Sequence, residues 1–172
     1  RDGETAEIAM RSAITGHVVL STLHTNDAVG VIDRLGDIGV EPYLTASALK
    51  GVISQRLVRR ICPNCREAYT PTDEELEHLG IEREPDLKFY RGKGCPRCFD
   101  TGYRGRIAVF EILTINRKIR RLIADSAGRE AIEKELFGPD GDFVTLHENA
   151  IRLVKEGITS CAEVVRVIAQ ED

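Results

Sequence analysis

The sequence predicts an α/β fold, because stretches with helical periodicity alternate with stretches that favour strands. Residues 5–15 carry apolar side chains at mixed spacings of three and four, which suits a helix, and Gly16 follows where a helix would end. The next stretch, VVLSTL at 18–23, is apolar on both faces through Leu20, as is typical of a central strand in a parallel sheet. RIAVFEIL at 106–113 predicts another strand late in the chain.

Two further helices are expected before residue 62. Asn26 or Asp27 can accept hydrogen bonds from the first amides of one helix, whose apolar side chains recur from Val29 to Ile38. Pro42 is expected to begin the other, which continues through YLTASALKGVISQRLVRRI to residue 61. The expected inner stripe of this long helix consists of Leu44, Ala48, Val52, Leu57 and Ile61.

The composition changes at Cys62, where a stretch rich in proline and charge begins. Within it, the spacing of Thr72 and Glu75 predicts a capping box for a short acidic helix. After the strand at 106–113, four helical patterns begin near Asn116, Ser126, Thr145 and Ser160, and the last two have possible reciprocal caps in Glu148 and Glu163. We therefore expect three consecutive segments: an α/β part at 1–61, a module at 62–105, and a strand followed by a helical subdomain at 106–172.

The bulk properties are those of a globular protein. The chain has 172 residues, of which 42% are hydrophobic and 30% are charged, enough for one full domain or two small ones. It contains no run of about eighteen uncharged apolar residues and no export signal, so we expect a cytoplasmic setting. The formal charge of -4 argues against broad binding to nucleic acid, which depends on neutralising phosphates with basic residues.

The beginning of the chain predicts that it is an internal piece of a longer protein. It opens on Arg1, and RDGETAEIAMRSAITG leads directly into a helix with no strand before it. A strand is expected first, because an isolated opening helix has nothing to pack on.

Four cysteines predict a metal site. Cys62-Pro-Asn-Cys65 and Cys95-Pro-Arg-Cys98 are two Cys-x-x-Cys turns separated by 29 residues, and such pairs place four thiolates around one tetrahedral Zn2+. Four protein ligands leave no open coordination position, so this zinc is expected to be structural. Disulfides are disfavoured by the expected cytoplasmic setting, and a catalytic dithiol would need a single Cys-x-x-Cys beside a βαβ unit. A zinc ribbon that binds nucleic acid is a further alternative, although the aromatic platforms it would use are few. The fifth cysteine, Cys161, is expected to be a buried small side chain.

The stretch HVVLSTLHTND predicts a ligand site at the end of a strand. Ligands of parallel α/β sheets bind outside the carboxyl ends of the strands, where Thr22 and His24 would lie. The sequence holds no G-x-x-x-x-G-K-[ST] phosphate loop and no apolar strand that ends in Asp-Glu. If His24 faces a nucleotide, the groups that bind that nucleotide lie upstream of residue 1.

These motifs together resemble the carboxyl-terminal half of the type II secretion E protein and type IV pilus assembly B protein ATPases, members of the secretion ATPase superfamily. The resemblance covers RDGETA through CPNC, a second CPRC, TGYRGRIAVFEIL and HENAIRLVKEGITSCAEVVRVI. It implies a hexameric P-loop (RecA-like) motor that uses ATP and Mg2+ and stands at the cytoplasmic face of the inner membrane. Implied partners are the other subunits of the homo-hexamer, the inner-membrane platform and the recruiting proteins of the machine, with no nucleic acid.

The resemblance also implies roles for individual residues. STLHTND matches the histidine box, which puts His24 near the γ-phosphate as a sensor, with Thr22 beside it. RDGETA follows the Walker B strand in the family, so Arg1 and Asp2 would stand next to a catalytic glutamate that this chain lacks. The segment 62–105 matches the zinc-binding subdomain of the family. Without the Walker A loop and the Walker B glutamate, this chain is expected to be inactive alone. The alternative is a zinc-stabilised docking module with no nucleotide chemistry.

Overall fold

The computed structural model describes residues 2–139 and 141–168, which belong to two compact units. Unit 1 combines Arg1–Ser54 with Glu111–Val144, and unit 2 combines Gln55–Phe110 with Thr145–Asp172. Each unit therefore brings together two stretches that are distant in sequence. These units differ from the three consecutive segments 1–61, 62–105 and 106–172, which remain a prediction about the functional parts of the chain.

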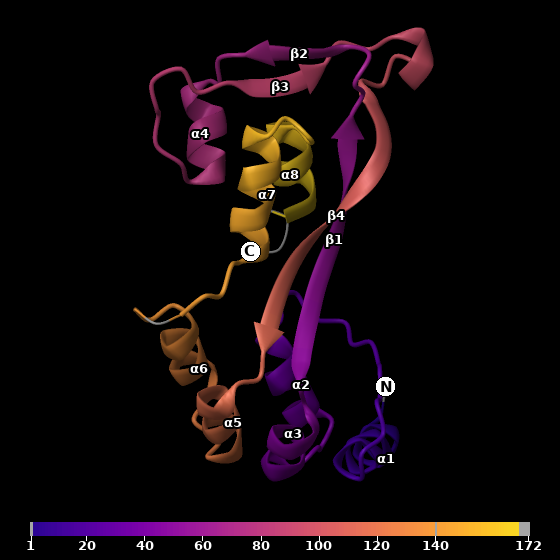
Figure 1. Cartoon of the computed structure of the whole chain (residues 1–172), viewed down its shortest axis with the longest axis vertical. Helices are drawn as coiled ribbons and strands as arrows, with labels where there is room; N and C mark the ends of the chain where they lie inside the picture. The colour runs from indigo at the N-terminus through magenta and orange to yellow at the C-terminus, as the bar shows by residue number, and fades with distance from the viewer. Residues whose placement is uncertain (1, 140, 169–172) are drawn as a thin grey trace. The chain divides into compact units, whose positions relative to one another are not determined.

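Unit 1 is mainly helical. Its helices are α1 (Gly3–Ile14), α2 (Gly30–Asp37), α3 (Pro42–Ala48), α5 (Arg117–Ala124) and α6 (Arg129–Leu136). Helix α3 contacts α1, α2 and α5, and α5 also contacts α6 (Figure 1). The predicted helix at 5–15 is confirmed, and so is a helix that begins near Asn116. Asn116 caps α5 by accepting a hydrogen bond from the amide of Ile119.

The core of unit 1 forms where α3, α5 and α6 meet the ends of two strands. Strand β1 is Gly51–Ile61 and strand β4 is Tyr103–Thr114, and the two pair in a two-stranded sheet. Leu113 at the end of β4 is fully buried with Ile119 of α5 and Ile132 of α6. A smaller cluster of Leu35, Val40 and Leu44 lies beneath α2 and α3.

The long helix predicted from Pro42 to residue 61 is wrong. Helix α3 ends at Ala48, Leu49 is extended with ψ 127°, and the remainder forms β1. From Val52 to Val58 the more buried positions alternate with exposed ones, a period of two that belongs to a strand. Leu57, which the helical stripe placed inside, is half-exposed. A run of apolar residues that includes β-branched ones fits both the helical period of about 3.6 residues and the strand period of about two. Here the pairing with β4 favours the strand.

The strand predicted at 18–23 is also absent. Residues 17–25 are extended but are assigned to no sheet, and the side chains of Val18 and Leu20 are 91% and 92% exposed. The two sheets found among the described residues are β1–β4 and β2–β3, so no parallel sheet is available to this stretch. A strand becomes stable only when its backbone groups pair with a neighbour, and apolar composition alone does not provide one. The α/β class itself is confirmed.

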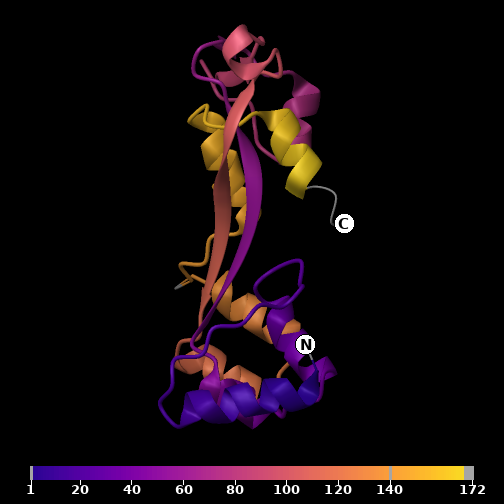
Figure 2. The ribbon, with the colours of Figure 1, turned by 90° about the vertical axis from the view of Figure 1, so that its right-hand side faces the viewer.

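Unit 2 contains a small antiparallel sheet and three helices. Strand β2 (Arg66–Tyr69) pairs with β3 (Phe89–Gly92) in the register Arg66↔Gly92 to Tyr69↔Phe89. Helices α4 (Asp73–Leu79), α7 (Leu146–Lys155) and α8 (Cys161–Ile168) complete the unit together with parts of β1 and β4. Helix α8 contacts both α4 and α7, and β3 lies against α7 (Figures 1 and 2). A short 3-10 turn, η1 (Pro96–Cys98), follows β3.

The helices of unit 2 begin at capping residues and pack around one hydrophobic core. The predicted capping boxes Thr72–Glu75 and Thr145–Glu148 are both present at the starts of α4 and α7. The core includes Val58 of β1, Leu79 of α4, Phe89 of β3, Val109 of β4 and Val154 of α7. Cys161 is buried within it, as predicted. Among the described residues, no helix combines the length and apolar character needed to cross a bilayer.

Glu163 is the most heavily bonded buried side chain of unit 2. It is fully buried at the start of α8, and its amide binds Ser160 Oγ as expected for a cap. Its carboxylate does not complete the reciprocal box predicted from sequence. Instead it accepts hydrogen bonds from the backbone and guanidinium of Arg59 in β1, at 2.7–2.9 Å, and from Arg166 at 2.8 and 3.1 Å. Burial opposes ionisation, but the two arginines outweigh it and lower the pKa of Glu163 to about 2.

Glu163→Gln should destabilise unit 2 by about 2 kcal/mol, because a neutral amide cannot replace the charge-assisted bonds to two guanidinium groups. Urea unfolding followed by tyrosine fluorescence measures this directly. The chain has no tryptophan, and three of its four tyrosines, Tyr69, Tyr90 and Tyr103, lie in unit 2. Glu77→Gln, on the exposed side of α4, is the matched control and should change little.

The wild-type chain should also lose this contribution in acid. A carboxyl with a lowered pKa stabilises the fold above its ordinary value of 4.5, and that stability disappears as the pH falls from there towards about 2. Glu163→Gln should therefore show a smaller loss of stability across this pH range than the wild type. Parallel stability curves for the two proteins would contradict the assigned role of Glu163.

Candidate functional site

The four cysteines predicted as metal ligands meet in unit 2. Cys62, Cys65, Cys95 and Cys98 offer sulfur atoms that all lie within 4.8 Å of one another. The Sγ–Sγ distances are 3.9 Å for Cys62–Cys95, 3.8 Å for Cys65–Cys98 and 3.7 Å for Cys95–Cys98. All four are free thiols, since a disulfide would need a sulfur separation of about 2.05 Å.

The spacing of the sulfur atoms fits a tetrahedral metal site. In a tetrahedron with metal–sulfur distances of about 2.3 Å, the sulfur atoms lie about 3.8 Å apart. The three measured separations of 3.7–3.9 Å match this geometry. The donor set is composed of sulfur alone, which suits soft or borderline cations. The cluster can therefore hold one metal ion with no further ligand.

Backbone hydrogen bonds hold the two cysteine turns in place. Cys65 N binds Cys62 O at 3.3 Å, and Cys98 N binds Cys95 O at 3.0 Å, so each turn is closed on itself. The turns are also joined to each other's flanking residues, because Lys93 N binds Cys65 O and Cys62 N binds Gly102 O. Gly92 and Gly102 meet backbone to backbone: a Cβ on Gly92 would lie 2.1 Å from Gly102 O. These contacts hold the two turns beside each other in the folded chain.

The surroundings of the sulfur atoms favour a thiolate at one position. Burial opposes ionisation of Cys98, but the backbone amides of Gly102 and Cys95 outweigh it and lower the pKa of Cys98 to about 7. Burial, together with hydrogen bonds to the neighbouring thiols, raises the pKa of Cys65.

The predicted nucleotide-sensing residues lie in unit 1 on the extended stretch at 17–25. Thr22 and His24 are both exposed, and no hydrogen bond engages either side chain among the residues that the structure describes. They offer one hydroxyl and one imidazole to an external ligand. Thr25, the next polar residue, turns back and donates from Oγ1 to Asp27 O at 3.0 Å.

Two carboxylates fix the end of this stretch to the rest of unit 1. Asp27, one of the two predicted acceptors, accepts from the amide of Gly30, the first residue of α2, at 2.6 Å, although Val29 occupies the N-cap position. Asp27 also pairs with Arg129 Nη2 of α6 at 2.5 Å. Glu111, buried in β4, accepts from the amide of Ala28 at 2.7 Å. No local pattern identifies Glu111 or Arg129, because they lie 83 and 102 residues from their partners.

Asp2 and Arg1 were predicted to stand near a catalytic acid. Asp2 caps α1, where its Oδ1 accepts from the amide of Thr5 at 2.9 Å, and this bond lowers the pKa of Asp2. Arg1 lies outside the described residues. The structure gives Asp2 a helix-capping role, and a nucleotide-binding role for either residue stays a prediction.

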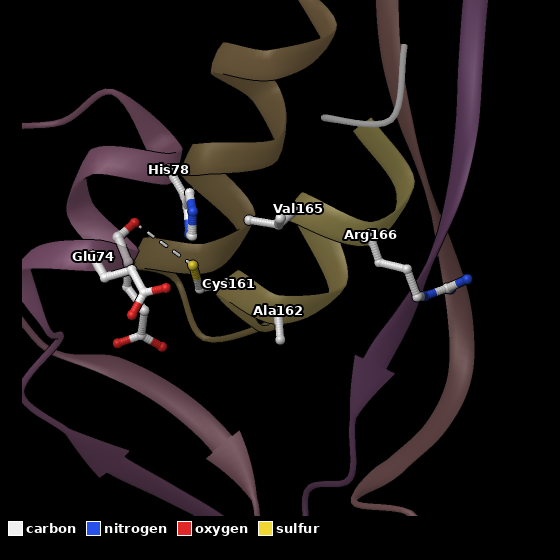
Figure 3. Close-up of a pocket in the computed structure, with 7 residues that line it drawn as sticks. Glu74, His78, Cys161, Ala162, Val165 and Arg166 are labelled. Carbon is white, nitrogen blue, oxygen red and sulfur yellow. Dashed lines mark hydrogen bonds between the residues drawn. The ribbon is translucent and has the colours of Figure 1, made fainter. Parts of the chain in front are cut away.

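An open groove of about 580 Å3 lies between α4 and α8 (Figure 3). It is lined by Glu74 and His78 of α4 and by Cys161, Ala162, Val165 and Arg166 of α8, and the side chain of Arg166 points away from α4 (Figure 3). Two of its charged side chains have partners within unit 2: Arg166 donates to Glu163, and Glu75 accepts from Tyr69. Burial raises the pKa of Cys161 to about 11, and its thiol lies 3.7 Å from Glu75 O. A protonated, buried thiol is a poor nucleophile, so this groove lacks the features of a catalytic site.

Comparison with known proteins yields one consistent result. The family model for type II/IV secretion system proteins matches residues 1–166. "Type II secretion system ATPase E" from Vibrio cholerae is 43% identical over 97% of this chain and 33% of its own length. "Type IV pilus assembly ATPase PilB" from Thermus thermophilus is 44% identical over 96% of this chain and 19% of its own length. The chain therefore spans a third or less of these two relatives.

A solved structure shows the same fold. The pilus retraction motor PilT with bound ADP superposes with a TM-score of 0.60 and is 26% identical, over 96% of this chain and 36% of that chain. The similarity thus extends over nearly the whole chain.

Arg129→Gln should loosen the stretch that carries His24. Its guanidinium pairs with Asp27, and the loss of this partner should raise hydrogen-exchange rates of the amides at 24–30 by about three- to tenfold, which corresponds to about 0.7–1.4 kcal/mol. Arg121→Gln removes a more exposed pair with Asp125, at 3.6 Å on the neighbouring helix α5, and serves as the control. Equal exchange in both variants would show that Asp27 is held by other contacts.

Proposed function

Because this chain belongs to the type II/IV secretion system protein family, we propose that it forms part of the ATPase motor of a type II secretion or type IV pilus machine. The observation that carries the proposal is the similarity to ATPases of both systems over 96% or more of the chain. In this function the parent protein couples ATP hydrolysis to assembly of a pilus or a secretion pseudopilus, and so to protein transport.

His24 is the proposed sensor of the terminal phosphate, with Thr22 beside it. Both side chains are exposed, and an imidazole N–H and a hydroxyl are donors suited to phosphate oxygens. Asp27, three residues after His24, is bonded to both α2 and α6. A change in the contact that His24 makes can therefore reach two helices through a short path. Hydrolysis itself requires Mg2+ and a water-positioning acid, which the parent protein would supply elsewhere.

In the full-length protein, His24→Ala should lower ATP turnover by about tenfold or more while nucleotide affinity changes little, since the contact matters most as charge develops on the phosphate. Steady-state hydrolysis and equilibrium binding of a fluorescent ATP analogue measure the two quantities separately. His147→Ala, an exposed histidine of α7, is the control and should retain activity. Unchanged turnover in His24→Ala would remove the sensor role.

Zinc is the proposed occupant of the four-sulfur cluster. Zinc favours tetrahedral thiolate sites, and the observed sulfur separations suit its bond length. Four protein ligands leave no position for a substrate, so the ion would stabilise the fold of residues 62–98 and perform no chemistry there. Structural zinc contributes on the order of 10 kcal/mol in small modules, which a segment of low apolar content requires.

Metal analysis of the purified chain should give about one zinc per molecule, and Cys65→Ala should lose most of it, because three sulfur ligands bind far more weakly than four. Cys161→Ala removes a cysteine that is buried outside the cluster and should keep the metal. A chelator should unfold the 62–98 region, as monitored by hydrogen exchange. If the metal-free chain kept full protection there, the zinc would not be structural.

The remaining parts of the proposal concern the assembly. The parent would act as a homo-hexamer bound at the inner membrane through the platform and recruiting proteins of its machine, and the chain alone would not hydrolyse ATP. The relatives with named functions in both secretion and pilus assembly support the setting, and the present chain spans a third or less of them.

A further inference from the structure

Phe99 is an aromatic side chain with no place in the core. It follows directly after Cys98 at the end of η1, and it is 90% exposed, more than any other phenylalanine among the described residues. Among the described residues, no other aromatic ring packs on Phe99 and no cation lies over its face. Packing in the core therefore does not explain a phenylalanine at this position.

The backbone does not explain it either. Phe99 has φ 52° and ψ 44°, and Asp100 has φ 59°, so both occupy the left-handed region. Glycine and asparagine adopt this region at low cost, whereas a bulky residue is strained there. Position 99 thus carries a residue that its own conformation disfavours and its own fold does not bury. A contact with another molecule best explains a large apolar side chain that is exposed and has a left-handed backbone.

The loop that presents Phe99 is rigid. Asp100 N binds Cys95 O at 3.0 Å, Thr101 N binds Cys98 O at 3.2 Å, and Thr101 Oγ1 binds the same carbonyl at 2.6 Å. Gly94 packs against the backbone of Asp100, where a Cβ would come within 2.9 Å of its carbonyl oxygen. A partner that binds Phe99 would therefore pay little entropy for ordering the loop, which is the advantage of a preorganised anchor.

The charged residues that flank this anchor in the sequence are mainly basic. Arg97, Arg104 and Arg106 lie within seven residues of Phe99, are exposed, and form no ion pair among the described residues. Arg97 makes only a long bond of 3.3 Å to the side-chain amide of Asn64. Asp100 is the one carboxylate between positions 95 and 106. Phenylalanine and arginine together are typical of the central contacts of protein interfaces.

We infer that the second cysteine turn is a docking point, in which Phe99 enters an apolar pocket of a partner protein and Arg97 and Arg104 contact carboxylates at the rim of that pocket. A rigid loop with a single aromatic anchor fits a shaped pocket. A membrane surface would be a poorer match, because one phenylalanine and three arginines give only weak attachment to lipid. This role is independent of nucleotide chemistry in unit 1.

The test begins with Phe99→Asn in the full-length protein. Asparagine suits the left-handed conformation, so the variant should keep its metal and unfold at the same temperature as the wild type or a higher one. A clear loss of thermal stability or metal would show that Phe99 serves the fold, and would overturn the inference.

The partner is sought by replacing Phe99 with p-benzoylphenylalanine in the cells that make the protein, followed by irradiation and mass spectrometry. One protein adduct, crosslinked in a pocket that contains Asp or Glu, is expected. Adding Arg97→Glu and Arg104→Glu should lower its yield by about tenfold, and Phe99→Asn should weaken binding to the purified partner by about tenfold or more. The same probe at Phe137, an aromatic 57% exposed in unit 1, is the control and should not give this adduct.

Three outcomes would overturn the inference, two from crosslinking and one from a vesicle-binding assay. The first is an adduct only with another copy of the same protein, and the second is no discrete adduct at all. The third is binding to vesicles of anionic phospholipid that is lost in Phe99→Asn, which would assign this surface to the membrane.

Discussion

The convergence of four sulfur atoms is the constraint on which the region from β1 to β4 depends. Residues 62–98 contain a two-stranded sheet, one short helix and few apolar side chains, too little to bury a core without help. The sulfur atoms gather from turns that lie 33 residues apart, and the bond from Lys93 N to Cys65 O closes the Arg66–Gly92 end of the β2–β3 sheet. This arrangement places β3 against α7 and α4 against α8, so the metal-binding residues organise contacts well beyond the cluster.

Local signals in the sequence were sufficient for much of this structure. The capping boxes at Thr72 and Thr145, the helix that begins near Asn116 and the pairing of the two Cys-x-x-Cys turns were all predicted, because each depends on residues a few positions apart or on a fixed ligand geometry. The errors came where pairing over long distances decides. The stretch at 51–61 forms a strand because β4 lies beside it, and the stretch at 18–23 is no strand because none of the described residues pairs with it.

The same distinction applies to the candidate sites. His24 could be identified from STLHTND, but its support could not, since Glu111 and Arg129 approach from the other half of the sequence. Glu163 shows how misleading a local pattern can be. Its position three residues after Ser160 suggests a reciprocal cap, yet its carboxylate faces Arg59, 104 residues away, and Arg166. A buried charge binds the strongest donors available, which here are guanidinium groups.

The extended stretch before Asp27 has a consequence for what can pair with this chain. Val18 and Leu20 expose nearly their whole side chains, and the stretch belongs to no sheet among the described residues. Such a segment has the composition of a strand and lacks one to join, so it offers itself to any complementary edge in solution. A strand supplied by another part of the parent protein or by a second molecule would cover Val18 and Leu20 by pairing with this stretch.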